Sequence, residues 1–109
     1  VYPVVADPHV EWHWWGNTFY FNRDETGSLA YQISQTNYAI GGSGAIISAL
    51  TYWYPLAAAV ALGITLYTTG ISSAIDRIDY HYSQGECLGI NRVYSGANWM
   101  FFHDGFLCY

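Results

Sequence analysis

The sequence contains no lysine, and its three arginines, Arg23, Arg77 and Arg92, lie far apart. The formal net charge is −5, and the pI is about 4.9. No basic stripe can therefore neutralise a series of phosphates, which excludes nucleic acid as an expected partner. The same shortage of cations removes the attraction to anionic lipid headgroups that cationic antimicrobial helices use. Any membrane activity must then depend on apolar surface.

Charged residues of both signs are scarce. They make up 10% of the chain, whereas soluble domains contain about 25%. Hydrophobic residues reach 52% and aromatic residues 19%, so the chain has ample apolar material to fold and is not disordered. With 109 residues, we expect a single domain, residues 1–109, with one core. Tyrosine, glycine and small polar residues must cover much of the outside, as in many secreted or self-associating proteins.

Cysteine occurs only at Cys87 and Cys108. We predict a disulfide between them, which would stabilise the fold by roughly 3 kcal/mol. Two free thiols of a cytosolic protein are the alternative. The chain begins VYPVVADPHV, without an initiator methionine and without the basic-then-apolar order of a signal peptide. We therefore expect a secreted or cell-surface protein after signal-peptide removal, although a trimmed expression product would begin in the same way.

The first residues indicate extended structure. Two prolines favour an extended arm over residues 1–8. Aromatic, β-favouring runs then predict a β-hairpin over residues 9–22, with strands at 9–15 and 18–22 and a turn at Gly16-Asn17.

A helix is predicted over residues 23–37. Asn22 can act as its N-cap, and Glu25 stands three positions later, where it can reach back in a capping box. Gly27 and several Ser and Thr residues weaken this helix.

The central part of the chain is uncharged, since no Asp, Glu, Lys or Arg occurs from Thr26 through Ile75. A break at Gly41, Gly42 and Gly44 and a stop before Pro55 predict two apolar helices, at about 43–53 and 55–82. A sharp turn between them gives a helical hairpin over 43–82, and a shallow turn gives one kinked helix.

The last part of the chain returns to strand-like residues. Residues 86–109 predict a meander of two or three strands tied by Cys87–Cys108, with turns at Ser95-Gly96 and Asp104-Gly105. Its strands are expected at 87–94, 97–103 and 106–109. The expected fold class is therefore α+β, with an N-terminal β-hairpin, a central apolar helical hairpin and a C-terminal disulfide-tied β-meander.

Residues that could carry chemistry are few. His9 and His13 would lie about 13 Å apart on a strand, and a metal site that adds His81 or His103 is less expected than ordinary packing histidines. Asp76 and Asp79, with Arg77 between them, fit a solvated helix end better than an acid–base pair. GGSG at 41–44 fits neither a nucleophile elbow nor a phosphate loop. We expect no enzyme activity, no cofactor and no metal site.

Small residues recur at intervals of four, which lets helices approach closely in bilayers and in tight pairs alike. Around Pro55 these positions are Gly41, Ala45 and Ala49, then Ala59 and Gly63, then Gly70 and Ala74. Tryptophan suits both a membrane interface and a protein core. The five tryptophans are Trp12, Trp14, Trp15, Trp53 and Trp99.

The uncharged segment admits three interpretations: a transmembrane helix, buried helices of a folded domain or assembly, and helices that insert conditionally. The apolar helix expected before Pro55 has only about 12 residues, whereas a bilayer-spanning helix needs about 20. Residues 56–75 are just long enough, although several Ser and Thr residues dilute their hydrophobicity.

The order of motifs resembles that of small secreted bacteriocin-like proteins of Gram-positive, particularly actinobacterial, bacteria. The resemblance rests on FYFNRDETGSLA, the glycine- and alanine-rich uncharged helices, and GECLGI followed by GFLCY, and it covers about residues 19–108. It implies secretion and permeabilisation of the membranes of competing cells.

The leading hypothesis is therefore a secreted bacteriocin-like protein whose uncharged helical hairpin inserts into a target membrane, as a homo-oligomer. The alternative is an extracellular structural protein that assembles into a filament, lattice or ring, because so little charge leaves apolar patches that monomers seldom expose. A small-ligand or metal-binding module is a third hypothesis, which only the histidines favour.

Overall fold

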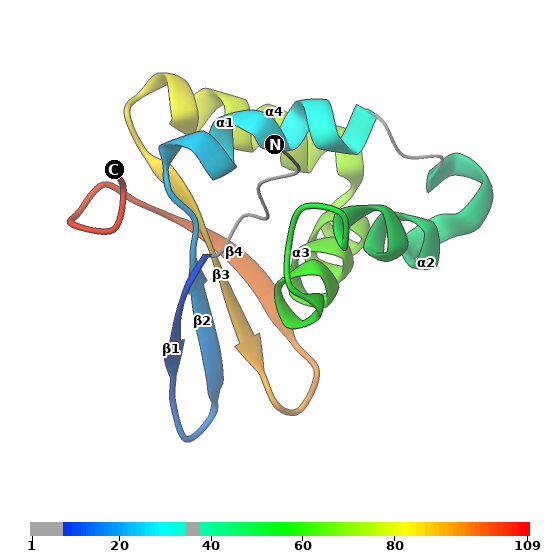
Figure 1. Cartoon of the computed structure of the whole chain (residues 1–109), viewed down its shortest axis with the longest axis horizontal. Coiled ribbons are helices and arrows are strands. Elements are labelled where there is room, and N and C mark those ends of the chain that lie inside the picture. Colours follow the sequence, from blue (N-terminus) through cyan, green and yellow to red (C-terminus); the bar gives the residue numbers. More distant parts are fainter. Residues whose placement is uncertain (1–7, 35–37) are drawn as a thin grey trace.

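Strands begin and end the part of the chain that the computed structural model describes, residues 8–34 and 38–109, and helices lie between them (Figure 1). The α+β class is thus confirmed. The elements in chain order are β1 (His9–Trp12), β2 (Gly16–Tyr20), α1 (Arg23–Ser34), α2 (Tyr38–Leu50), α3 (Leu56–Thr69), α4 (Ile71–Ser83), β3 (Cys87–Val93) and β4 (Asn98–His103). The arm predicted over residues 1–8 lies outside the described residues except for Pro8.

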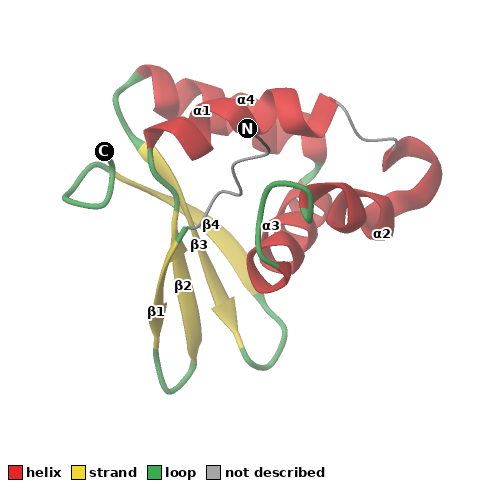
Figure 2. Cartoon of the chain, viewed as in Figure 1, coloured by secondary structure: helices red, strands yellow, loops and turns green. Residues whose placement is uncertain are grey.

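The strands form one antiparallel sheet in the order β1-β2-β3-β4. The N-terminal hairpin and the C-terminal hairpin are therefore joined through β2 and β3, a pairing that the sequence analysis did not predict. In Figure 2, α1 and α4 cross one end of the molecule and the two hairpin turns lie at the other.

One face of the sheet carries the core. Val10, Phe19, Ile90 and Met100 lie opposite one another across the four strands, so their side chains share a face. The helices pack on this face, with α3 and α4 contacting β3. The uncharged α3 lies in the middle of the core, where Ala58, Ala59, Ala61, Leu62 and Leu66 are buried.

The predicted capping box at the start of α1 is present. The Asn22 side-chain oxygen accepts a hydrogen bond from the Glu25 backbone N–H at 2.9 Å, and a Glu25 carboxylate oxygen accepts one from the Asn22 N–H at 2.9 Å. The two residues satisfy each other's free backbone donors at the helix end. The described helix ends at Ser34, and the last predicted residues, 35–37, lie outside the described part.

The position predicted for the first hairpin turn is wrong. The turn is formed by His13–Trp15, with the His13 N–H donating to Gly16 O at 2.8 Å, while Gly16 and Asn17 belong to β2. Gly16 is required for close packing, because a Cβ there would lie 1.9 Å from the Arg92 carbonyl oxygen. The absence of a side chain at Gly16 therefore allows β3 to pack closely against β2 and does not serve a turn.

The prediction of a single helix over 55–82 is also wrong. Gly70 has φ 97°, a left-handed value that glycine adopts readily. The chain bends there by 109° between α3 and α4. The preceding α2 begins at Tyr38 instead of residue 43, and of the three predicted glycine breaks only Gly42, at φ 63°, interrupts it. Pro55 precedes α3, as predicted.

The C-terminal hairpin matches its prediction in two strands out of three. β3 and β4 are joined around Ser95-Gly96, and Gly96 has φ 113°. The disulfide between Cys87 and Cys108 is present, with 5.5 Å between the Cα atoms. Residues 106–109 form no strand, because a turn in which the Cys108 N–H donates to Gly105 O brings Cys108 back to Cys87.

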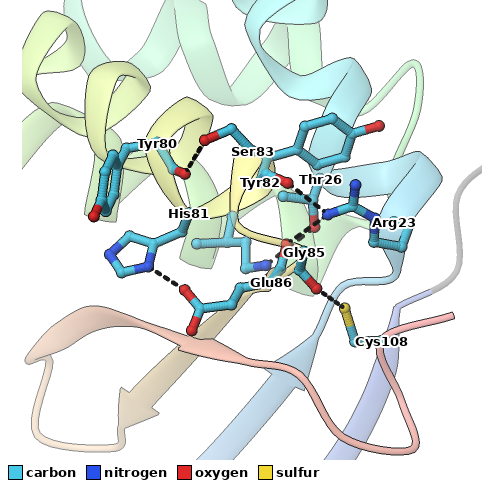
Figure 3. Close-up of polar contacts among 10 residues, drawn as sticks. Arg23, Thr26, Tyr80, His81, Tyr82, Ser83, Gly85, Glu86 and Cys108 are labelled. Atoms are coloured by element: carbon cyan, nitrogen blue, oxygen red, sulfur yellow. Dashed lines mark hydrogen bonds and ion pairs between the residues drawn. The ribbon is translucent and has the colours of Figure 1, made fainter.

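Arg23 ties the start of α1 to the segment between α4 and β3 (Figure 3). Its guanidinium donates to Tyr82 O at 2.8 Å and to Glu86 O at 3.1 Å, and it lies 3.9 Å from the centre of the Tyr82 ring. His81 pairs with Glu86 beside it and stacks on Phe102 at 3.8 Å. These contacts are structural, and they occupy one of the three arginines.

Candidate functional site

A second cross-strand row lies two positions beyond the core row, toward the hairpin turns. Trp12, Asn17, Arg92 and Asn98 are successive partners across β1, β2, β3 and β4. Because side chains alternate along a strand, this row shares the helix-covered face with the core row. The first turn of α3 meets it at Ala57, and together they enclose a pocket of about 250 Å³.

Within the described part of the chain, two side chains of this row, Asn17 and Asn98, have polar atoms without a hydrogen-bond partner. Asn17 is only 4% exposed, and its carboxamide has no hydrogen bond to any residue in the described ranges. Asn98 Oδ1 is buried without a partner among the same residues. Buried polar atoms are nearly always satisfied in folded proteins, and each one left unpaired costs about 1–3 kcal/mol. Asn17 lines the pocket, so its unpartnered carboxamide indicates a place for a ligand.

The one charged residue among the described lining residues of the pocket is a cation, although the protein is acidic. Arg92 lines it, and its guanidinium makes no ion pair with the part of the chain that the structure describes. No Asp or Glu is among the described lining residues. The start of α3 adds to this, since Pro55 provides no side-chain cap and the first turn contains no acidic residue. Free N–H groups at a helix start carry partial positive charge.

Exposed aromatic side chains gather at the hairpin turns, and two of them, Trp12 and Tyr94, line the pocket. Trp12 is 70% exposed, Trp14 90% and Tyr94 64%. Hydrogen bonds join the two turns, since the Tyr94 N–H donates to Trp15 O at 3.0 Å and the Tyr94 hydroxyl to His13 O at 3.4 Å. We call Trp12, Trp14 and Tyr94, on these two joined turns, the aromatic end of the molecule.

The five tryptophans do not form one belt. Trp12 and Trp14 belong to the aromatic end, and Trp15 stacks on His13 with 4.6 Å between ring centres. Trp53 is partly buried against the core. Trp99 lies opposite Asn91 on the other face of the sheet and is 47% exposed.

The small residues divide into packing residues and one linker. A Cβ on Gly63 would lie 2.5 Å from Ile47 Cγ1, so α2 and α3 are in close contact there. Ala59 and Ala74 are buried, and Ala45 and Ala49 are half-buried. Gly70 is exposed, with nothing within 4 Å of an added Cβ, and thus serves as the bend and not as a packing surface. Gly41 lies in α2, and Pro55 is exposed before α3.

The histidines lie in separate places. His9 and His103 flank Tyr20 on the open face of the sheet, at 5.9 and 5.2 Å between ring centres. Burial raises the pKa of Tyr20, and the charge of Glu11 raises it further. Among the described residues no three His, Cys, Asp or Glu side chains are grouped to hold a metal. Asp76 and Asp79 are both exposed on α4.

Within the described ranges, no single helix is long and apolar enough to cross a bilayer. The bent pair of α3 and α4 passes that test of length and composition when taken together.

No protein-family model, curated protein or solved structure matches this chain.

Sequence reasoning missed the polar row. In the sequence Arg92 is one of three scattered cations, Asn17 is a predicted turn residue, and Asn98 has no predicted role. The sequence signal for this row was spacing, because each of its residues lies two positions before or after a core residue of the same strand. That signal acquires meaning only when β2 is known to pair with β3, because the pairing brings residues 17 and 92 together.

Proposed function

We propose that this chain is a secreted, membrane-active protein of the bacteriocin-like type, which attaches to a target membrane through its aromatic end. The observation that carries the proposal is the exposure of Trp12, Trp14 and Tyr94 on two joined turns. Indole and phenol rings favour the membrane–water interface, where the ring lies in apolar surroundings and the N–H or O–H stays hydrated. A projecting pair of turns can reach this depth without any change in the fold.

The second step of the proposed action is insertion of α2 and α3. These helices belong to a stretch without charge, from Thr26 to Ile75, so their transfer into lipid exposes no ionised side chain. In the folded chain they pack against each other at Gly63 and Ile47 and line the core, and to insert they must leave the core and separate from each other. Gly42, within α2, and Gly70, directly after α3, interrupt the helical backbone and supply points at which these helices can swing out. Several copies are expected to act together.

Secretion is part of the proposal. A disulfide between Cys87 and Cys108 is compatible with an extracellular location, because such bonds persist in oxidising compartments. The bacteriocin-like resemblance implies the same location.

Dye release from liposomes tests the attachment step. Micromolar protein is expected to release an entrapped dye, and the double variant Trp12→Ser/Trp14→Ser to lose at least tenfold of that activity. Trp99→Ser is the matched control, since Trp99 is also exposed but lies on the other face of the sheet. Absence of leakage from the wild-type protein, or equal losses in both variants, contradicts the proposal.

A designed crosslink tests the insertion step. In Ile47→Cys/Gly63→Cys, the new side chains start at atoms already close enough for a disulfide, since a Cβ on Gly63 lies 3.5 Å from Ile47 Cα. The oxidised variant is expected to bind liposomes without leakage, and mild reduction to restore leakage. Wild-type protein given the same reductant is the control for the native disulfide. Full leakage from the locked variant would show that α2 and α3 need not separate.

Self-assembly is the second candidate function, and the sheet edges favour it. β1 and β4 are the outer strands of the sheet, and unpaired edges can join to other copies. Light scattering over a range of concentrations, with a variant lacking residues 1–8, separates the two candidates. Particles that grow with concentration and collapse in the variant favour assembly, whereas a small species that causes leakage favours membrane action.

A further inference from the structure

We infer that the pocket between the hairpin turns and α3 binds the phosphate group of a polyol phosphate. Under the proposed membrane function, on which this step rests, the source is the glycerophosphate headgroup of an anionic lipid such as phosphatidylglycerol. Through this pocket, the aromatic end selects among membranes by their lipid headgroups.

A bound anion needs a cationic partner, and of the three arginines Arg92 is the one that lines the pocket. Arg23 is occupied by the carbonyl oxygens of Tyr82 and Glu86, and Arg77 is exposed on α4. Arg92 lines the pocket and pairs with no acidic residue of the described chain. A guanidinium offers a planar fork of N–H donors that matches two oxygens of a phosphate.

Neutral donors converge on the same space. Ala57, in the first turn of α3, lines the pocket, and this helix start lacks a side-chain cap. Helix starts with free N–H groups bind phosphate readily. Independently, the Asn17 side chain lines the pocket. Asn17 is only 4% exposed, and its side chain has no hydrogen-bond partner within the described ranges. Arg92, Asn17 and the start of α3 thus bring donors from three different elements to the pocket.

The Asn17 carboxamide favours a polyol over a quaternary ammonium. Besides its N–H donors, Asn17 has a carbonyl oxygen that accepts hydrogen bonds, and this side chain lines the pocket. Hydroxyl groups of glycerol donate to such acceptors, whereas the trimethylammonium of phosphocholine has no donor. A primary ammonium could donate, but it would lie beside the positive Arg92.

The place and size of the pocket fit a headgroup. Tryptophan and tyrosine settle at the headgroup level of a bilayer, and the exposed Trp12 and Tyr94 line the pocket. When the aromatic end lies in the interface, the pocket is therefore at the depth of the lipid phosphates. Its volume of about 250 Å³ is below the usual range for drug-sized ligands, about 300–1,000 Å³. A glycerophosphate group fits this space, and acyl chains do not.

Vesicle sedimentation tests the inference, with vesicles of phosphatidylcholine alone and vesicles containing phosphatidylglycerol. About 0.15 M salt screens the overall negative charge beyond about 8 Å. Arg92→Gln is expected to lower binding to phosphatidylglycerol vesicles at least tenfold and leave binding to phosphatidylcholine unchanged. Arg77→Gln, with the same change in net charge, is expected to alter both by less than twofold. Asn17→Asp is a second variant, which places a negative charge in the pocket and is expected to abolish the preference.

Soluble glycerol 3-phosphate provides the second arm. In NMR titrations it is expected to shift the Asn17 side-chain amide signals of the wild-type protein and not those of Arg92→Gln. If wild-type protein binds no vesicles but shows this shift, the phosphate site stands and the membrane function fails. If the shift is absent and Arg92→Gln binds both kinds of vesicle as the wild type does, the site is overturned even where leakage persists. Equal losses in Arg92→Gln and Arg77→Gln mean diffuse charge attraction and also overturn it.

Discussion

Gly63 of α3 lies so close to Ile47 of α2 that a Cβ on the glycine would be 2.5 Å from Ile47 Cγ1. A branched side chain of one helix thus fills the space left by a missing side chain on the other. This contact explains why small residues at intervals of four belong to the core of the folded chain. It joins the two helices that the proposed function requires to separate.

Gly63→Ala is expected to lower the free energy of unfolding by about 1–2 kcal/mol, because overpacking outweighs the gain of about 1 kcal/mol in helix propensity. Gly44→Ala is the control. An added Cβ at Gly44 meets nothing within 4 Å, so this variant should gain a few tenths of a kcal/mol. Urea denaturation measures both. In an Ile47→Ala background, Gly63→Ala should become neutral or stabilising, and an unchanged cost there would rule out this contact as the cause.

Asn22→Ala removes the side-chain acceptor for the Glu25 N–H and should cost about 1 kcal/mol of stability. Asn22→Asp keeps an acceptor and adds a charge favourable to the helix start, so it should retain wild-type stability. Thermal unfolding followed by circular dichroism distinguishes the two. Equal midpoints for both variants would mean that the capping box contributes nothing.

Tyr54 makes the stability of the fold decrease as the pH rises in the alkaline range. Its ring is buried, and its hydroxyl donates to Gln32 Oε1 at 2.8 Å. Burial raises the pKa of Tyr54 well above the usual value, and the charge of Glu25 adds to the rise. Below about pH 10 the residue is protonated in both states, and its contribution to stability is complete. Above that pH the unfolded chain loses this proton while the folded chain keeps it, so stability falls by up to about 1.4 kcal/mol per pH unit.

Tyr54→Phe should flatten this alkaline slope. At neutral pH the variant should lose about 1–3 kcal/mol, because the buried Gln32 loses its partner. Tyr52→Phe, at an exposed tyrosine, is the control and should keep the wild-type slope. The measurement is urea denaturation at intervals between pH 8 and 11, where no lysine is present to titrate. Identical slopes for wild type and Tyr54→Phe would contradict the assignment.

Loss of the disulfide should cost about 3 kcal/mol, since the bridge closes a loop with a sequence separation of 21. The variant Cys87→Ala/Cys108→Ser suits the buried position 87 and the more exposed position 108. Its urea midpoint should match that of reduced wild-type protein. Unchanged stability would mean that the last turn is held by other contacts, such as the Arg23 N–H donating to Tyr109 O.

Features that depend on neighbouring residues were predictable. The capping box of Asn22 and Glu25, the start of a helix after Pro55 and the turn at Ser95-Gly96 follow from backbone chemistry within a few positions. The disulfide was predictable because the chain has only one pair of cysteines. In each case the interacting groups are close in the sequence or have no competing partner.

Contacts between distant segments determined the strand pairing and the roles of several glycines. Gly16 looked like a turn residue, yet its lack of a side chain serves the approach of Arg92, 76 positions away. Gly70 looked like part of a packing surface, yet its left-handed backbone redirects the chain. The sequence by itself determined the class of fold, its local caps and turns, and an uncharged centre. Only the tertiary structure decided which strands pair, and with that pairing which side chains share a face. Asn17 and Arg92 therefore line one pocket through long-range register, which no local pattern encodes.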